Sequence, residues 1–239
     1  MAGAPPLSKY LGEVRAVGEL AQFVMTDTTA TLPRGDGHSV IVYPGLIASD
    51  TATHLLRSRL AELGYDVHGW EQGRNHGLQR DVMAEIRSQL VHLCRKSERK
   101  VSLIGWSLGG LFAREVAKRR PDCVRLVITA GTPCSDFRAN HAWKTYERLA
   151  EHKVDELPVE TDLAALPPVP VTAIYSDMDG IVAPECMDIG RGDRHESVKV
   201  QSTHMGLVWS REVLAIAADR LAQPEGAWAP YQPRPAKDE

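Results

Sequence analysis

Short runs of β-branched and apolar residues alternate along the chain with longer segments in which apolar positions recur every three or four residues. The short runs predict strands at 39–43, 65–70, 100–104, 123–129, 169–176 and 197–201. Strands that alternate with helices in this way are typical of a parallel sheet covered by helices. The pattern therefore predicts an α/β fold, a mostly parallel sheet of six or slightly more strands with helices on both faces.

The longer segments predict amphipathic helices. The apolar stripe between the first two strands consists of Ala52, Leu56, Leu60 and Leu63. Gly64 follows this stripe as a helix stop. Stripes with the same periodicity predict further helices around 82–93 and 213–221.

Three segments fall outside this alternation. Residues 1–30 predict an added amphipathic helix whose apolar face packs on the rest of a single domain, 1–223. Residues 132–168 have aromatic side chains among many charges and predict a small helical insertion. We interpret this insertion as a cap over a site, with a long solvated connection as the alternative. The proline-rich tail, 224–239, is expected to be a disordered spacer.

The composition is that of an ordinary globular protein, with 43% hydrophobic and 25% charged residues among 239. A net charge of -3 supplies no strong positive field, so no nucleic-acid partner is expected. The longest uncharged stretch, 163–176, contains three prolines and is too short to cross a bilayer. The first residues lack the pattern of a signal peptide, so a cytoplasmic location is expected.

The cysteines lie far apart in the sequence. There are four of them, and no Cys/His cluster has the spacing of metal ligands. We therefore expect free or buried thiols rather than a disulfide framework or a zinc site.

The most informative stretch is Val-Ser-Leu-Ile-Gly-Trp-Ser-Leu-Gly-Gly, in which an apolar strand runs through a tight turn into a helix. A nucleophilic serine must project from such a turn, and Gly105 and Gly109 remove side chains that would clash there. The following helix directs free amide hydrogens at the space beside Ser107, where an oxyanion would form. Ser107 is therefore the predicted nucleophile.

A serine hydroxyl needs a base to remove its proton, and that base needs a partner that fixes its tautomer. In open parallel sheets the site lies beyond the carboxyl ends of the strands, so both groups are expected in loops that follow later strands. The loop after 197–201 contains His204, whereas His195 precedes that strand and lies at the wrong end of the sheet. His204 is the predicted base.

The loop after 169–176 offers two carboxylates. Asp177 lies almost at the end of the strand, whereas Asp179 lies in the turn with room to reach an imidazole. We favour Asp179 as the acid of the triad and interpret Asp177 as a turn carboxylate that bonds its own backbone. A metal pair of these two residues lacks further ligands at suitable spacing.

The loop after 39–43 contains Pro44, Gly45 and Leu46, and its glycine lets the chain turn close to a substrate. The backbone amides of Leu46 and Leu108 are the predicted oxyanion donors. A glycine-rich loop, 69–77, follows the next strand and is expected to wall the pocket. Arg74 and Asn75 are interpreted as pinning this loop through backbone carbonyls, with substrate recognition as the alternative.

The order Ser107, Asp179, His204 around this strand–turn–helix motif resembles the α/β-hydrolase superfamily, in its lipase and esterase branch. The resemblance covers about 39–221 and implies an acylated serine, release of the acid by water, and no cofactor or metal. The sequence Asp-Gly-Ile-Val from Asp179 looks like the family's acid loop. Two features depart from the family: helical residues stand where early antiparallel strands are common, and Pro44-Gly45 replaces the usual His-Gly.

These residues together predict a serine carboxylic-ester hydrolase that acts on a small-molecule or lipid acyl ester. Acyl transfer or thioester cleavage by the same triad is an alternative from a neighbouring class. A binding protein on the same fold is a third, and it would not react with an activated ester.

Overall fold

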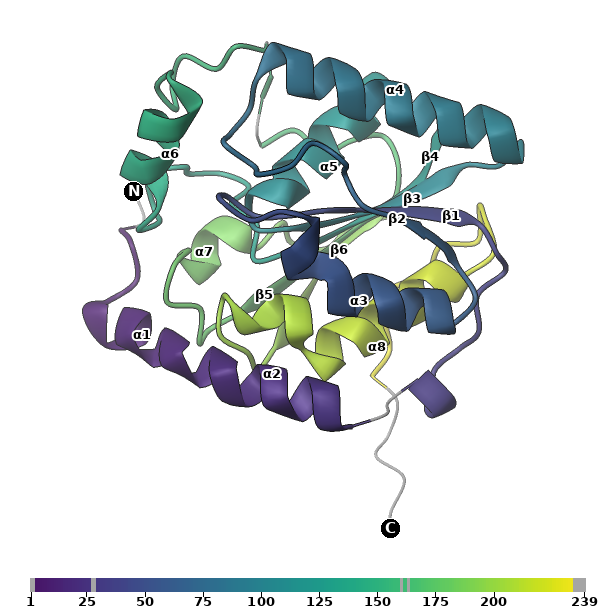
Figure 1. The fold of residues 1–239 in the computed structure, drawn as a ribbon, viewed down its shortest axis with the longest axis horizontal. Coiled ribbons are helices and arrows are strands. Elements are labelled where there is room, and N and C mark those ends of the chain that lie inside the picture. Colours follow the sequence, from purple (N-terminus) through teal and green to yellow (C-terminus); the bar gives the residue numbers. More distant parts are fainter. Residues whose placement is uncertain (1–2, 27–28, 160, 163, 234–239) are drawn as a thin grey trace.

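The computed structural model describes residues 3–26, 29–159, 161–162 and 164–233, which form a parallel sheet with helices on both faces (Figure 1). The six strands are β1 (Ser39–Tyr43), β2 (Asp66–His68), β3 (Val101–Trp106), β4 (Val124–Ala130), β5 (Val171–Ser176) and β6 (His195–Val200). Their order in the sheet is β2-β1-β3-β4-β5-β6, and every pair is parallel. The predicted α/β class, strand number and helix coverage are confirmed.

Two hydrophobic cores fill the space between the sheet and its helices. Helices α4 (Arg80–Ser97) and α5 (Leu108–Arg119) cover one face, and α3 (Asp50–Glu62) and α8 (Arg211–Ala222) cover the other (Figure 1). Along β1, Ile41 and Tyr43 point into the first core while Val40 and Val42 point into the second. Because β1 is buried on both faces, its sequence is apolar at almost every position.

The strand order reverses direction at β1, which lies between β2 and β3. The chain leaves β1 toward β2 on one side and then crosses back to β3 on the other. At such a switch point the loops that follow the two central strands separate and leave a crevice at the carboxyl edge of the sheet. The loops that begin at Pro44 and Ser107 lie at this crevice.

The N-terminal segment consists of α1 (Leu7–Gly12), the 3-10 turn η1 (Glu13–Arg15) and α2 (Ala16–Met25), followed by η2 (Thr29–Thr31). The expected packing of its apolar stripe on the domain is wrong. Stripe residues Leu7, Leu11, Val14, Val17 and Val24 are 54% to 74% exposed. The opposite side faces the domain, where Ala16 and Phe23 are buried and two glutamates bond backbone amides.

Residues 132–168 contain one α-helix in their described part, α6 (Trp143–Ala150). This helix stands at one end of the sheet beside the amino end of α5 (Figure 1). The remainder of the segment is turns and extended chain, with 160 and 163 outside the described residues. The short elements α7 (Pro184–Met187) and η3 (Gly206–Trp209) follow β5 and β6.

The proline-rich tail, which is expected to be a disordered spacer, contacts the domain through Tyr231. The Tyr231 amide donates to Glu196 Oε2 at 2.7 Å, and the guanidinium of Arg220 lies 5.6 Å from the centre of the Tyr231 ring. These contacts hold the chain between 224 and 233 against α8 and β6. Residues 234–239 lie outside the described part of the chain.

All four cysteines are free thiols, and Cys123, Cys134 and Cys186 are buried. In the described ranges, no helix is both long and apolar enough to cross a membrane.

Candidate active site

Ser107 stands in a strained turn between β3 and α5. Its backbone has φ 54° and ψ -125°, a positive-φ conformation that residues other than glycine rarely adopt. A Cβ on Gly105 would lie 2.3 Å from the Cα of Gly110, and one on Gly109 would lie 2.2 Å from the carbonyl oxygen of Tyr43. Both glycines therefore permit close packing of β3, α5 and β1, which directs the serine hydroxyl outward.

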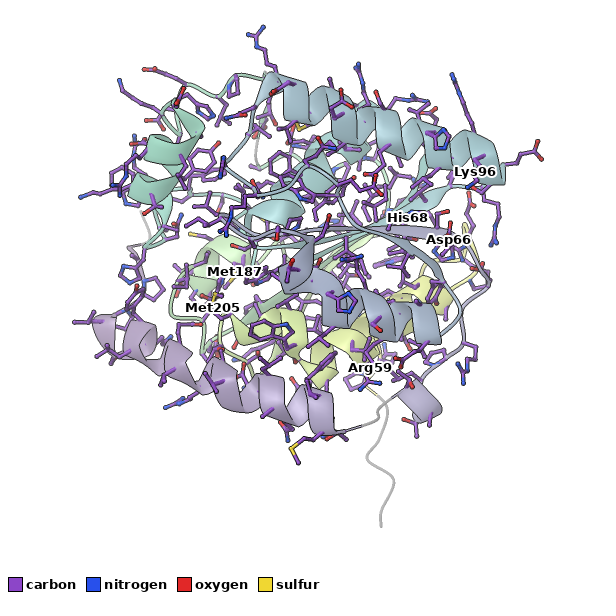
Figure 2. The ribbon with its side chains drawn as sticks, in the orientation of Figure 1. Arg59, Asp66, His68, Lys96, Met187 and Met205 are labelled. Atoms are coloured by element: carbon purple, nitrogen blue, oxygen red, sulfur yellow. The ribbon has the colours of Figure 1, made fainter. Side chains whose placement is uncertain are left out.

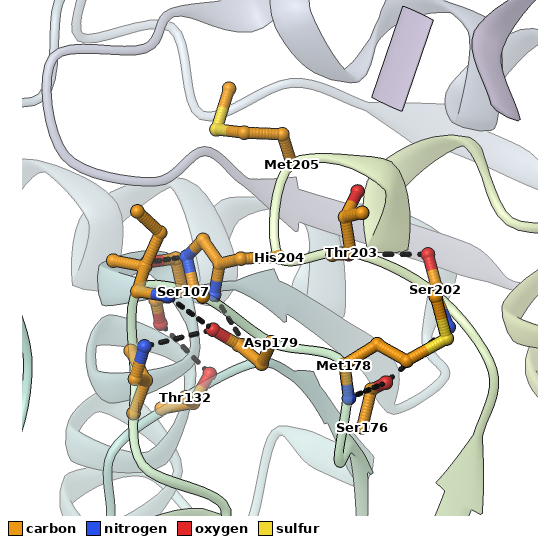
Figure 3. A network of polar contacts seen from close by, with 12 residues as sticks. Ser107, Thr132, Ser176, Met178, Asp179, Ser202, Thr203, His204 and Met205 are labelled. Atoms are coloured by element: carbon orange, nitrogen blue, oxygen red, sulfur yellow. Dashed lines mark hydrogen bonds and ion pairs between the residues drawn. The ribbon is translucent and has the colours of Figure 1, made fainter. Parts of the chain in front are cut away.

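The three predicted triad residues form one hydrogen-bonded chain (Figure 3). His204 Nε2 lies 2.9 Å from Ser107 Oγ, and His204 Nδ1 lies 2.6 Å from Asp179 Oδ2. The side chains come from the loops that follow β3, β5 and β6, so the carboxyl edge of the sheet brings them together. His195 begins β6 at the opposite edge.

The two candidate acids have different surroundings. Asp179 is fully buried, and its Oδ1 accepts hydrogen bonds from the amides of Ile181 and Val182, both at 2.8 Å. Asp177 is half exposed and pairs with Lys199 of β6. The structure thus brings Asp179, and not Asp177, to the imidazole.

Burial by itself would lower the pKa of His204. The charge of Asp179 and its hydrogen bond, together with the charge of Glu13, outweigh burial, so the pKa is raised above the ordinary value of 6.5. A carboxylate bonded to Nδ1 also holds the proton there, which leaves Nε2 of the neutral ring free to accept a proton from Ser107.

The predicted oxyanion loop lies beside the serine. A Cβ on Gly45 would come within 3.1 Å of the Ser107 Cβ, and Leu46 and Leu108 both line a cavity with Ser107. Leu108 is the first residue of α5, where backbone amides have no acceptor within the helix.

Asn75 ties the glycine-rich loop 69–77, which it was expected to pin, to the oxyanion loop at Pro44, whereas Arg74 is exposed. The fully buried side chain of Asn75 donates from Nδ2 to the carbonyl of Pro44 at 2.8 Å. Its backbone also exchanges hydrogen bonds with Ile47 and Ala48.

Two cavities meet at Ser107. A cavity of about 440 Å³ opens outward between Tyr10, Ile47 and Met205 and has mostly apolar walls. A narrow cavity of about 30 Å³ runs beneath α6 and is lined by Phe137, Trp143, Tyr146 and Val182, among others. Residues of the 132–168 segment therefore form walls of both spaces. In Figure 2, Met205 lies on the left side of the molecule and Lys96 of α4 lies on the right.

Two site contacts were not foreseen from the sequence. Glu13 and Glu19, from the N-terminal segment, bond the loops that follow β5 and β6. The sequence pattern does not show which group a carboxylate on the polar side of an amphipathic segment will bond, because that depends on where the segment packs. Across the described residues, no group of three or more His, Cys, Asp or Glu side chains is placed to hold a metal ion.

Comparison with known proteins gives short matches in sequence and long ones in structure. No family model matches the chain. A segment of 72 residues is 38% identical to the pimeloyl-[acyl-carrier protein] methyl ester esterase of Proteus mirabilis, covering 30% of this chain and 26% of that protein. The match thus spans about a quarter of the length of this curated relative.

Among solved structures, Aspergillus fumigatus lipase B superposes with a TM-score of 0.58 at 18% identity, over 83% of this chain and 56% of the lipase. The thioesterase domain from the curacin biosynthetic pathway superposes with a TM-score of 0.52 at 13% identity, over 80% of this chain and 93% of that domain.

The parallel sheet, its order and these superpositions define an α/β protein with its crevice at the carboxyl edge. The chain has the α/β-hydrolase fold, and the resemblance noted in its sequence is confirmed at that level.

Proposed function

We propose that this protein is a serine carboxylic-ester hydrolase in which Ser107 is the nucleophile, His204 the base and Asp179 the orienting acid. The observation that carries the proposal is the hydrogen-bonded chain from Asp179 through His204 to the hydroxyl of Ser107. The strained backbone of Ser107 is the second support, because a nucleophilic serine between a strand and a helix is held in such a conformation.

In the first half of the reaction, Ser107 Oγ attacks the ester carbonyl carbon while its proton passes to His204 Nε2. The tetrahedral intermediate collapses as the C–O bond to the alcohol breaks, and the leaving oxygen takes the proton from His204. The acyl group remains on Ser107. Water then loses a proton to His204 and attacks the acyl carbon, and the acid departs as that proton returns to Ser107.

The negative charge of each tetrahedral intermediate needs hydrogen-bond donors that are already in place. We assign this role to the backbone amides of Leu46 and Leu108, which flank the serine. Asn75 supports the assignment because it fixes the loop that carries Leu46.

The cavities favour an ester with one large apolar group and one small group. The outward cavity of about 440 Å³ suits an extended apolar chain, and the narrow one of about 30 Å³ suits a much smaller group. The curated relative is named for a methyl ester, which agrees with a small group on one side of the bond. Residues 132–168 would act as a cap that sets these sizes.

Acyl transfer or thioester cleavage is the second candidate, since a thioesterase domain shares the fold. Both reactions use the same acyl-serine and differ in the leaving group or the acceptor. Rates with acyl-CoA substrates, and product ratios with added alcohols, separate them from ester hydrolysis.

The location of the protein in the cytoplasm stays a prediction.

The test is release of p-nitrophenol from esters of increasing acyl length. Ser107→Ala is expected to lower the rate by about 10³-fold or more, because the variant lacks the hydroxyl that forms the acyl intermediate. Ser102→Ala is the matched control, since Ser102 also bonds a histidine but lies fully buried in β3. Its rate should stay within about twofold of wild type. A folded wild-type protein with no ester hydrolysis would contradict the proposal.

A further inference from the structure

One glutamate of the N-terminal segment contacts both loops that carry the proposed base and acid. Glu13 Oε1 accepts hydrogen bonds from the amides of Gly180 at 2.8 Å and His204 at 3.0 Å. Glu13 Oε2 accepts a third from the amide of Met205 at 2.9 Å. A single carboxylate in η1 therefore satisfies three backbone donors in two separate loops.

No covalent bond joins these two loops directly, so non-covalent contacts must fix the distance between them. Gly180 follows Asp179 in the loop after β5, whereas His204 lies in the loop after β6. The hydrogen bond between Asp179 and His204 requires the loops to remain at a fixed separation. Hydrogen bonds from backbone amides to a carboxylate are stronger than neutral ones, so Glu13 is well suited to hold that separation.

The N-terminal segment packs closely against the backbone of the acid loop at Gly180. A Cβ on Gly180 would come within 2.3 Å of the Lys9 carbonyl oxygen and 2.8 Å of the Tyr10 Cα. Glycine at this position therefore lets the N-terminal segment approach the acid loop closely. The approach is what brings Glu13 within reach of both loops.

We propose that Glu13 is a positioning residue for the ester hydrolysis, holding the Asp179 and His204 loops together from the N-terminal segment. This proposal rests on the proposed function of the triad. Glu13 does not contact Ser107 and lines neither cavity, so it acts through the backbone of the two loops, including that of Met205 beside the outward cavity.

Glu13 also acts on His204 by charge. Its carboxylate raises the pKa of His204 in the same direction as Asp179, against the lowering effect of burial. The other ionisable groups nearby are Glu19, which bonds Thr203, and His141 and Tyr10, which share the outward cavity with His204. Loss of the Glu13 charge should therefore lower the pKa of His204.

Glu19 is a matched control within the same segment. Like Glu13 it is half-buried, and it accepts hydrogen bonds from the Thr203 amide at 3.0 Å and the Thr203 hydroxyl at 2.9 Å. It also accepts from the hydroxyl of Ser202 at 3.1 Å. Its bonds reach only the loop after β6 and none of the amides that Glu13 binds.

The experiment compares Glu13→Gln, Glu13→Ala and Glu19→Gln in the intact protein, with circular dichroism and thermal unfolding to verify folding. Glu13→Ala is expected to lower kcat by about 10- to 100-fold with a smaller change in KM, because the loops lose their fixed separation while the cavity loses none of its lining side chains. Glu13→Gln keeps one acceptor oxygen, so it should recover part of kcat. In both variants the acid limb of the pH profile should move to lower pH.

Equal losses of kcat in the Glu13 and Glu19 variants, with the acid limb unmoved in both, would overturn the proposal, because a merely structural contact predicts that result. An independent readout is the NMR titration of the His204 imidazole in a Ser107→Ala background, which needs no turnover. A lower His204 pKa in Glu13→Gln than in Glu19→Gln supports the proposal, and identical titrations overturn it. Absence of hydrolysis by the wild type would contradict the proposed function alone, and the titration would still decide the role of Glu13.

Discussion

At the scale of single residues, an Asp, a His and a Ser are linked by contacts at two places in the described part of the chain, one of which is the proposed triad. In the set of contacts outside the proposed triad, His38 Nδ1 bonds Asp36 and His38 Nε2 lies 2.8 Å from Ser102 Oγ. Ser102 is fully buried within β3, whereas Ser107 stands in a strained turn that lines two cavities. The three residue types therefore do not define a reactive site by themselves, because a nucleophile also needs access and an outward-directed hydroxyl.

The acid of the proposed triad can be tested by removing each candidate charge in turn. Asp179→Asn is expected to lower kcat by about 10²- to 10³-fold, because an amide can no longer hold the His204 proton on Nδ1. Asp177→Asn removes only the exposed pair with Lys199 and should stay within about twofold of wild type. Steady-state kinetics of both variants measure the difference, and the reverse ranking would show that Asp177 is the acid.

The raised pKa of His204 sets the pH dependence of the reaction. Only the neutral ring can accept the proton of Ser107, so activity should fall as pH decreases through the pKa of His204. Because Asp179 and Glu13 raise this pKa, the midpoint of the acid limb is expected above pH 6.5. A profile of kcat/KM against pH gives the midpoint, and a rate that increases toward acid pH would contradict the assignment of the base.

At the scale of elements, the N-terminal segment docks through the side that its hydrophobic pattern marks as polar. Carboxylates of Glu13 and Glu19 replace water at amides of the loops after β5 and β6, while Phe23 enters the core between α8 and the sheet. Charge-assisted hydrogen bonds, the buried Phe23 ring and the edge-on contact of Tyr10 with His141 therefore hold this segment, and its larger apolar stripe remains exposed.

This docking mode predicts opposite outcomes for two apolar truncations in the segment. Phe23→Ala should lower the free energy of unfolding by about 3 kcal/mol, since the side chain is almost fully buried. Leu11→Ala should change it by less than about 0.5 kcal/mol, since that side chain is mostly exposed. Chemical denaturation measures both, and a larger loss for Leu11→Ala would mean that the stripe is covered in solution.

At the scale of the whole molecule, different groups of residues gather at the carboxyl and amino edges of the sheet. The proposed chemistry lies at the carboxyl edge, and the amino edge holds an ionic network in which the buried side chains of His38 and Arg125 meet the half-exposed carboxylate of Asp36. There Asp36 accepts hydrogen bonds from His38 and from Arg125, and Arg125 also bonds the carbonyl of Gln223 after α8. This network ties the start of β1 to β4 and to the end of the last helix.

The network should make stability depend on acid pH. Burial alone would raise the pKa of Asp36, but hydrogen bonds from His38 and Arg125 lower it well below the ordinary 3.8. A lowered pKa in the folded state contributes stability above about pH 4 that is lost as pH falls toward the folded value. Asp36→Asn should therefore be less stable than wild type at pH 7, and the difference should shrink at pH 3.

Urea unfolding at the two pH values measures this difference. Asp155→Asn is the matched control, because its ion pair with Arg138 is exposed on both sides and should contribute less than about 1 kcal/mol. A stability difference for Asp36→Asn that is the same at both pH values would contradict the role of the Asp36 charge.

The sequence by itself determined the fold class and the three residues of the proposed triad. The strands β1 and β3 are almost entirely apolar because they are buried on both faces, and the strand–turn–helix motif around Ser107 has a local signature. The rule that sites lie beyond the carboxyl ends of parallel strands then selected the loops of Asp179 and His204. Each of these inferences depends on local pattern and on chain order alone.

Only the tertiary structure decided how the added segments meet that core. The N-terminal stripe was expected to pack inward and faces outward, and residues 224–233 of the tail are held by Glu196 and Arg220. The carboxylate of Glu13 is separated by more than 160 residues from the amides it binds. Such contacts are absent from any local pattern, because a carboxylate on a helix surface bonds water equally well until docking brings unsatisfied amides within reach.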